Sequence, residues 1–305
     1  MPNTQDRANV VLLAYRRPEM MLRRCQEVIA WPGLGQLIVS IDGVSRQASD
    51  DEKLWRSESL KLAKEFAMSN PGVAVLDHPK NSGLTDHVVR ALTAGFENSN
   101  AVILLEEDVS ITFQGLDFLA QTVDQGTPSA STAYSRATHP VKCGSRKTFF
   151  PEQWGVGMNR SFFEAFGRVL KYGKVDSVVV EAHLKKALGK GFPSLRRRAI
   201  KYWTTLLQSA LQVENHTDAI FHYTAMVCGI HYATPWRSAV VDEGPQDNRG
   251  LNPRGKRPLR NLRHSYVGAD FCKRCELRNM HAKALLGPYY WYSRLYAHFR
   301  GIWPK

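Results

Sequence analysis

Residues 101–109 are Ala-Val-Ile-Leu-Leu-Glu-Glu-Asp-Val, five apolar residues followed directly by three carboxylates. The length and composition of the apolar run predict a buried central β-strand. Because the interior of a sheet does not tolerate unpaired charges, we expect Glu106, Glu107 and Asp108 to lie just past the carboxyl end of this strand. Ligands of open α/β sheets bind at that edge. The stretch therefore predicts an α/β fold with an acidic site at one edge of its sheet, and a solvated acidic turn is the alternative.

The segments before this strand alternate between short apolar runs and longer amphipathic ones. The short runs predict strands at 9–14, 37–41 and 73–76, and the longer segments predict helices at 18–30, 51–69 and 85–97. This alternation predicts a mostly parallel, doubly wound central sheet with helices on both faces. Asp42 follows the second strand and precedes Gly43, a residue free to take positive φ, so we expect another carboxylate at the same edge.

The second part of the chain predicts more helix than strand. We expect helices at 114–123, 160–170 and 195–212 and after Asp218, an edge strand at 131–135, a basic loop at 142–146 and a strand-like run at 235–241. Asp218 would lie near the N-terminus of its helix, where a plain capping role is the alternative to a catalytic one. Segment 149–158 is aromatic and glycine-rich, a composition that suits either a sugar-binding surface or a filled core.

Lysine and arginine outnumber the acidic residues by 41 to 28 in this chain of 305 residues, which gives a formal net charge of +13. Such a surplus favours anionic partners: nucleotides, phosphorylated lipids, nucleic acid or an acidic membrane face. No apolar run reaches the ~18 residues of a membrane span and the N-terminus lacks a signal-peptide pattern, so we expect a cytoplasmic protein. The five cysteines do not suggest a disulfide framework. Cys272 and Cys275 form one Cys-x-x-Cys pair, for which reduced thiols are expected and zinc is the alternative.

The sequence lacks the usual glycine-rich phosphate-binding loops. Neither Gly-x-Gly-x-x-Gly after the first strand nor Gly-x-x-x-x-Gly-Lys-Ser/Thr is present, which argues against dinucleotide and P-loop phosphate binding. A sheet that binds phosphate without these loops needs another positive charge. Mn²⁺ or Mg²⁺ held by the hard oxygen ligands of the acidic stretch would supply it.

Five motifs occur in the order that resembles glycosyltransferases of the GT-A fold, whose central sheet is Rossmann-like. They are Val-Leu-Leu-Ala-Tyr-Arg-Arg-Pro at 11–18, Ser-Ile-Asp-Gly at 40–43, Asn-Ser-Gly-Leu at 81–84, Leu-Glu-Glu-Asp at 105–108 and Trp-Gly-Val-Gly at 154–157. The resemblance covers about 9–250 and extends to N-acetylglucosaminyltransferase I and bacterial surface-polysaccharide enzymes. It implies transfer of a hexose from a nucleoside-diphosphate sugar to a hydroxyl of a glycan or lipid-linked acceptor, in polysaccharide biosynthesis.

Carried over residue by residue, the resemblance implies the following roles. The nucleotide-sugar site would comprise Ala14, Tyr15, Arg16, Asp42, Asn81, Gly83, Glu106 and Glu107. Asp108 would hold the metal, which neutralises charge on the leaving diphosphate, and Trp154 and Gly155 would contact the acceptor. Asp218 would be the general base, with Glu152 as the second candidate, and a single base implies inversion.

Two positions depart from the family pattern. Glu107 stands at the middle of the acidic motif, where aspartate is commoner, and this departure bears on metal affinity and metal dependence. Arg-Gly-Leu at 249–251 stands in place of the Thr-His pair that many relatives carry.

The same resemblance makes 1–255 a catalytic domain, with a nucleotide-sugar half at about 1–125 and an acceptor half at about 126–255. Residues 256–305 form a basic, aromatic extension. That composition predicts peripheral contact with the anionic inner face of a membrane. Docking of the extension on the protein itself or on a second subunit is the alternative.

Two other functions compete with the transferase. One is a basic membrane- or nucleic-acid-binding protein without transferase activity, suggested by the charge; the ordered motifs outweigh bulk charge, so nucleic acid is not an expected partner. The other is a sugar nucleotidyltransferase, which would carry a glycine-rich loop directly after the first strand, where Tyr15-Arg16-Arg17-Pro18 has no glycine.

Overall fold

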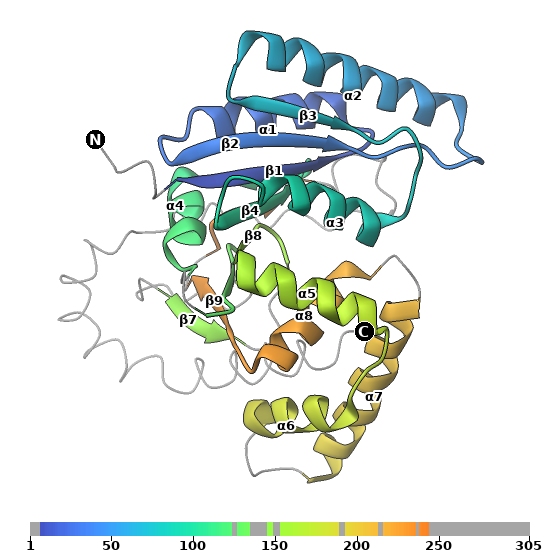
Figure 1. Cartoon of the computed structure of the whole chain (residues 1–305), viewed down its shortest axis with the longest axis vertical. Helices are drawn as coiled ribbons and strands as arrows, with labels where there is room; N and C mark the ends of the chain where they lie inside the picture. Colours follow the sequence, from blue (N-terminus) through green and yellow to red (C-terminus); the bar gives the residue numbers. More distant parts are fainter. Residues whose placement is uncertain are drawn as a thin grey trace, which may run out of the picture.

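The computed structural model describes residues 7–123, 127–134, 145–148, 153–188, 193–212, 216–235 and 238–243. Its centre is an eight-stranded sheet of order β3-β2-β1-β4-β8-β6-β9-β7 (Figure 1). The first half of the chain alternates strand and helix: β1 (Ala8–Ala14), α1 (Pro18–Ile29), β2 (Leu34–Ile41), α2 (Asp50–Ser69), β3 (Val73–Asp77), α3 (Leu84–Gly95) and β4 (Ala101–Glu106). The pairs β3–β2, β2–β1 and β1–β4 are all parallel, which confirms the predicted α/β class.

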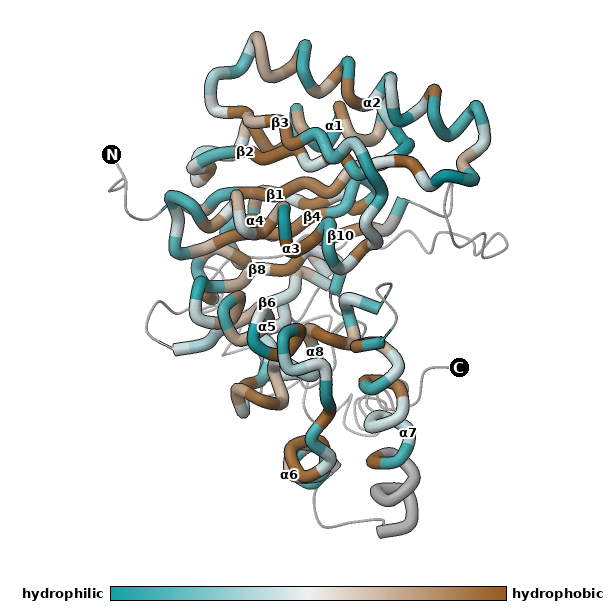
Figure 2. Tube along the Cα trace, turned by 45° about the vertical axis from the view of Figure 1, so that its right-hand side comes forward, coloured by the Kyte–Doolittle hydropathy of each residue, from teal (hydrophilic) through white to brown (hydrophobic). Residues whose placement is uncertain are grey.

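Helices cover both faces of this sheet because its central strands are apolar on both sides. All seven residues of β1 are buried. Val11 and Leu13 pack into a core shared with α3, α5 (Arg160–Tyr172) and α8 (Thr217–Cys228). Val10 and Leu12 pack on the opposite face into a core shared with α1, α2 and α4 (Phe113–Gln121). Figure 2 shows the strands as the most hydrophobic layer, with hydrophilic positions along the outer side of α2.

The second half of the chain adds short strands to the β4 side of the sheet and several helices. These elements are β5 (Val109–Ile111), β6 (Ala130–Thr132), β7 (Ser145–Thr148), β8 (Val156–Asn159), α6 (Ser177–Leu188), α7 (Pro193–Gln212), β9 (Tyr232–Pro235) and β10 (Val240–Asp242). Strand β8 runs antiparallel to β4, and β10 pairs with β5 in a separate two-stranded sheet. Helices α6 and α7 lie at the end of the molecule far from α2 (Figure 1).

Four local predictions were wrong. Strand β6 is an interior strand, because β8 and β9 pair with its two sides. Residues 145–148, part of which was expected to be a basic loop, form strand β7 through its pairing with β9. The expected strand-like run at 235–241 is two strands, because β9 ends at Pro235 and β10 begins at Val240. Glu106 is the last residue of β4 rather than the first beyond it, since it still pairs with Leu13 of β1.

Within the described part of the chain, the helices are too short or too polar to span a bilayer.

The local sequence determines where helix α2 begins. Its N-cap Ser49 accepts a hydrogen bond from the Glu52 N–H at 3.2 Å, and the Glu52 side chain accepts one from the Ser49 N–H at 3.2 Å. This capping box satisfies two helix-end donors and leaves the Glu52 carboxylate at the sheet edge, where Arg16 pairs with it.

Candidate functional site

The acidic turn between β4 and β5 is fastened to the end of β1. The Glu107 carboxylate is buried, and its oxygens accept hydrogen bonds from the Tyr15 N–H at 2.9 Å and the Arg16 N–H at 3.4 Å. The Glu107 N–H in turn donates to the Leu13 carbonyl at 3.0 Å. Burial raises the pKa of Glu107 to about 7, although the Tyr15 N–H and the Arg17 guanidinium act to lower it. Glu107 is therefore a fixed link between two parallel strand ends.

A buried arginine pairs with both carboxylates of this turn. Arg17 Nη1 lies 2.8 Å from Asp108 Oδ2 and 3.7 Å from Glu107 Oε1. Arg17 is 8% exposed and stands directly before α1, so the positive end of that helix points to the same place. The carboxyl ends of β1 and β4 thus combine two carboxylates, one guanidinium and a helix N-terminus. The guanidinium and the helix N-terminus can attract the oxygens of a diphosphate, whereas the two carboxylates can face them only through a bridging cation.

The end of β2 approaches the same edge from the other side of β1. The Asp42 N–H donates to the Ala14 carbonyl at 3.1 Å, and Asp42 Oδ1 accepts from the Gly43 N–H at 2.8 Å. Burial raises the pKa of Asp42 to about 6 against the lowering effect of the Gly43 N–H and Arg56. With a pKa of about 6, Asp42 is mostly ionised at pH 7 and is a hydrogen-bond acceptor close to the loop that carries Tyr15.

Gly43 is required because the 78–83 loop crosses directly over it. A Cβ on Gly43 would overlap the main chain of Lys80 and lie 2.5 Å from the Asn81 nitrogen. The glycine is not needed for a left-handed conformation: the positive φ angles of the described glycines belong to Gly83, Gly155, Gly173 and Gly229. Asn81 Oδ1 accepts from the Gly83 N–H at 3.1 Å and so shapes the approach to α3. This crossing brings the main chain of Asn81 against Gly43, the residue that follows Asp42.

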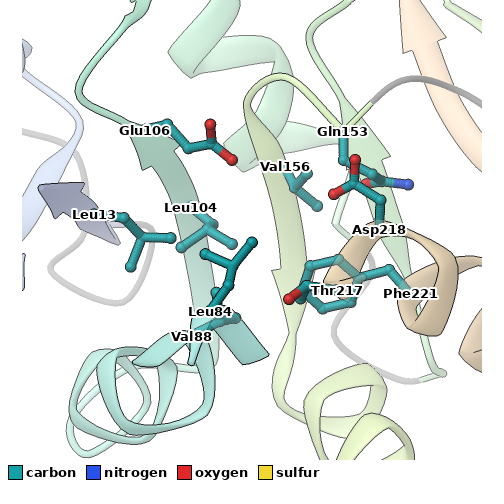
Figure 3. Close-up of a pocket in the computed structure, with 10 residues that line it drawn as sticks. All are labelled: Leu13, Leu84, Val88, Leu104, Glu106, Gln153, Val156, Thr217, Asp218 and Phe221. Atoms are coloured by element: carbon teal, nitrogen blue, oxygen red, sulfur yellow. The ribbon is translucent and has the colours of Figure 1, made fainter. Parts of the chain in front are cut away.

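A pocket opens beside this edge, between the end of β4 and the start of α8 (Figure 3). Glu106 and Asp218 point toward one another across it, Glu106 from β4 and Asp218 from α8. Both residues are exposed. The remaining lining combines two polar side chains with an apolar wall: Gln153, Thr217, Leu13, Leu84, Val88, Leu104, Val156 and Phe221. Two carboxylates facing each other over an apolar wall are suited to binding hydroxyl groups and taking up a proton.

Neighbouring contacts fix the wall that carries Asp218. Thr217 Oγ1 lies 3.1 Å from Thr85 Oγ1, a buried contact that joins the first turns of α8 and α3. The N-cap position of α8 belongs to His216, and Asp218 is the second helical residue. Asp218 therefore does not have the plain N-cap role that was the alternative, and its carboxylate extends into the pocket instead (Figure 3).

Comparison with known proteins gives remote likenesses. No protein-family model and no curated protein matches the chain. Among solved structures, a mannosyltransferase from Pyrobaculum calidifontis in complex with GDP-Man and Mn²⁺ aligns at 11% identity with a TM-score of 0.40, over 99% of this chain and 88% of the other. The inositol-1-phosphate CTP transferase from T. maritima aligns at 9% identity with a TM-score of 0.39, over 80% and 93%.

S. aureus TarS 1-349 aligns at 9% identity with a TM-score of 0.38, over 72% of this chain and 90% of that one. Likenesses at this level do not assign an activity or a ligand. The functional argument for this chain therefore depends on its own residues.

The structure brings most of the expected site residues to one edge, in two groups. Around the acidic turn lie Ala14, Tyr15, Arg16, Glu107 and Asp108; at the neighbouring end of β2 lie Asp42 and, on the crossing loop, Asn81 and Gly83; in the pocket lie Glu106 and Asp218. Trp154 is not in the pocket lining: its ring packs against Tyr134 at a centroid distance of 4.5 Å, in the core on the α1 face of the sheet. Glu152 and the Cys272/Cys275 pair lie outside the described residues, as does the 256–305 extension.

Gly155 is a structural glycine. Its φ is +68°, a conformation that L side chains rarely adopt, and a Cβ there would come within 3.3 Å of Ala133 Cβ, so a larger residue would be strained. It stands directly before β8, one residue after Trp154. An acceptor-binding role for Trp154 and Gly155 stays a prediction.

Three residues of the site were not among the expected ones. Arg17 pairs with the acidic turn, Glu52 pairs with Arg16, and Gln153 lines the pocket. The capping pattern Ser-x-x-Glu at 49–52 is a sequence signal that places Glu52 at a helix start, hence at this edge of a parallel sheet. Arg17 and Gln153 carry no such signal, because their partners lie far away in the sequence.

Proposed function

We propose that this protein is a glycosyltransferase that moves a sugar from a nucleoside-diphosphate sugar to the hydroxyl of a glycan or lipid-linked acceptor, with inversion at the anomeric carbon. The observation that carries the proposal is the pair of carboxylates, Glu106 and Asp218, that face each other across the pocket beside the Arg17 and acidic-turn cluster. The Arg17 and acidic-turn cluster suits a diphosphate, and the pocket with Glu106 and Asp218 suits a sugar and its acceptor. A donor lying across both would occupy the edge where open α/β sheets bind ligands.

The proposed chemistry is a single displacement. Asp218 takes the proton of the acceptor hydroxyl while that oxygen forms a bond to the anomeric carbon. The bond from this carbon to the diphosphate oxygen breaks, and the nucleoside diphosphate leaves with the bonding electrons. Glu106, on the opposite wall, accepts hydrogen bonds from sugar hydroxyls and orients the ring. The apolar wall excludes water, which otherwise competes with the acceptor.

The nucleoside part would lie at the ends of β1 and β2. Tyr15 is partly buried there beside Asp42, and the Arg16 guanidinium lies 5.3 Å from the Tyr15 ring centroid. Asp42 accepts a hydrogen bond from the base or the ribose, and Asn81 and Gly83 contact the nucleoside from the crossing loop. Arg17 and the N-terminus of α1 face the diphosphate.

The donor set at the acidic turn suits a divalent metal that is shared with the nucleotide. Among the described residues, no group of three or more histidine, cysteine, aspartate or glutamate side chains gathers to hold an ion by protein ligands alone. Asp108 is partly exposed and offers hard oxygens, and Mg²⁺ or Mn²⁺ accepts one carboxylate together with phosphate oxygens and water. Asp108 would hold such an ion, which would neutralise charge on the departing diphosphate when bound.

The test is product analysis on the full chain with a panel of nucleoside-diphosphate sugars. The proposal predicts release of nucleoside diphosphate that depends on an added acceptor, or slow release to water without one. Release of pyrophosphate from a nucleoside triphosphate and a sugar phosphate would instead identify a sugar nucleotidyltransferase. Binding of nucleic acid that weakens steeply with salt, without any nucleotide turnover, would identify the non-enzymatic alternative. Contact of the 256–305 extension with an anionic membrane stays a prediction.

A further inference from the structure

A charged network next to the acidic turn, formed by Arg23, Arg24 and Glu27 of α1 with Glu243, plays no part in the chemistry proposed above. It joins α1 to Glu243, the residue that follows β10. Arg23 Nη2 lies 2.5 Å from Glu243 Oε2, and Arg24 Nη2 lies 3.6 Å from the same oxygen. Arg24 Nη1 pairs with Glu27 Oε2 at 2.7 Å. The network therefore spans residues more than 200 positions apart, since Arg23 and Glu243 are separated by 220.

The main chain of Glu243 contacts the acidic turn itself. The Glu243 N–H donates to the Asp108 carbonyl at 2.8 Å. Directly beside this bond, Asp242 of β10 pairs with Val109 of β5 in the antiparallel register. Asp108 is therefore held from two sides, by Arg17 at its carboxylate and by Glu243 at its carbonyl.

Helix α1 is connected to both contacts that hold Asp108, through Arg17 on one side and through Arg24 and Glu243 on the other. Arg17 precedes its first residue, and Arg24 lies seven positions later, about two turns of an α-helix, so both face the same side of α1. Arg24 is 1% exposed, which makes its pairing with Glu243 and Glu27 costly to break. Burial lowers the pKa of Arg24 and raises the pKa of Glu27, as expected for charges withdrawn from water.

From these contacts we propose that Glu243 is a positioning residue for the acidic turn, which it holds in register with α1 through Arg24 and through the Asp108 carbonyl. The inference rests on the proposed function, because it concerns the same diphosphate site. The Glu243 carboxylate pairs with Arg23 and Arg24, so it would act on the nucleotide only through the turn. It sets the distance between Arg17 and Asp108, the two groups that would share the diphosphate.

The experiment is calorimetric titration of the full chain with UDP, GDP, CDP, ADP and dTDP, each with and without Mn²⁺. The variant is Glu243→Gln, which keeps the size and the main-chain bond but removes the charge that pairs with Arg23 and Arg24. We expect its affinity for the preferred nucleoside diphosphate to fall about 10-fold or more, as for other residues that orient a ligand-binding group. The control is Arg160→Met. Arg160 binds the Ser99 carbonyl at 3.0 Å at the opposite end of β4, so its loss should lower stability and leave affinity unchanged.

A second variant separates positioning from simple stabilisation. In Arg24→Met with Glu243→Met, the buried charge of Arg24 and its partner Glu243 are replaced by apolar groups. The charges that lose a partner are Glu27, whose side chain is 37% exposed, and the more exposed Arg23, so this variant should restore much of the thermal stability lost in Glu243→Gln. The affinity should stay low, because the turn is still released from α1. Full affinity in Glu243→Gln, or affinity that returns together with stability in the double variant, would overturn the inference alone. A wild-type chain that binds none of the five nucleotides would overturn the proposed function itself.

Discussion

Replacement of Arg17 by methionine tests the electrostatic centre of the site. The change removes the guanidinium that lies 2.8 Å from Asp108 and 3.7 Å from Glu107 and leaves two neighbouring carboxylates without it. At an effective dielectric constant of about 20, the two attractions amount to roughly 6 and 4.5 kcal/mol before the cost of desolvation. Breaking buried pairs typically costs about 3–5 kcal/mol. The side chain of Asp108 keeps 18% of its exposure, so we expect the lower end, about 3 kcal/mol of unfolding free energy at pH 8.

The cost should depend on pH because Glu107 titrates close to neutrality. Its pKa in the folded protein is raised to about 7, so between the unfolded value and pH 7 the folded state binds more protons and stability falls as pH rises. Loss of Arg17 would raise the pKa of Glu107 further and extend this fall above pH 7. At pH 6, Glu107 is already largely protonated and the variant loses only the Asp108 pair. We expect about 1–2 kcal/mol there.

The assay is urea unfolding followed by tryptophan fluorescence at pH 6 and pH 8, for wild type, Arg17→Met and Arg17→Lys. Lysine keeps the charge and should recover at least half of the loss. Arg160→Met is the control, because Arg160 binds main-chain carbonyls and its cost should be the same at both pH values. An Arg17→Met cost that is equal at pH 6 and pH 8 would refute the assignment of Glu107 as a titrating partner of Arg17.

Two further predictions concern the support of the site. His87 is buried with its Nε2 at 2.9 Å from Ser40 Oγ, beside His78, Arg90 and Asp86, and burial lowers its pKa to about 4. The wild-type free energy of unfolding should therefore fall as pH falls from 6.5 toward 4, and in His87→Gln up to about 3 kcal/mol of that loss should be absent, as measured by urea unfolding. Curves of unfolding free energy against pH that run parallel for the two proteins would contradict this prediction. Gly43→Ala should cost about 1–3 kcal/mol and weaken nucleoside-diphosphate binding, because its Cβ meets the main chain of the crossing loop. The control is Gly72→Ala, where a Cβ meets nothing within 4 Å, and equal effects of the two variants would refute the close-approach argument.

The sequence predicted the parallel half of the fold because its signals are local. The helices at 51–69 and 85–97 were expected within two residues of the observed bounds of α2 and α3. Strand β4 was recognisable because five apolar residues end in carboxylates. The second half was less predictable because strands such as β6 and β7 have three and four residues and depend on partners far away in the chain. Nothing in Ser-Arg-Lys-Thr at 145–148 alone indicates a strand until β9 lies beside it.

The candidate site, like the fold, was predictable from the sequence only in part. Asp42, Glu106, Glu107, Asp108 and Asp218 could be expected at one edge, because strand ends and a helix start are visible in the sequence. The direction in which each carboxylate points could not be predicted. Glu107 is engaged by main-chain N–H groups and Arg17, whereas Glu106, expected beside Glu107 in the nucleotide-sugar site, faces Asp218. That difference depends on the alternation of side chains at the last residue of β4. A sequence pattern fixes this alternation only when the end of the strand is known to the residue.

The most direct test of the account is the rate of Asp218→Asn in the acceptor-dependent release of nucleoside diphosphate, measured beside its affinity for the donor. Asparagine keeps the size of Asp218 and removes the proton acceptor that faces Glu106 across the pocket. The account predicts a rate at least about 100-fold lower, as for loss of a general base, with donor affinity changed less than about threefold. An Asp218→Asn enzyme that turns over at the wild-type rate would contradict the central claim that these two carboxylates form a transferase site.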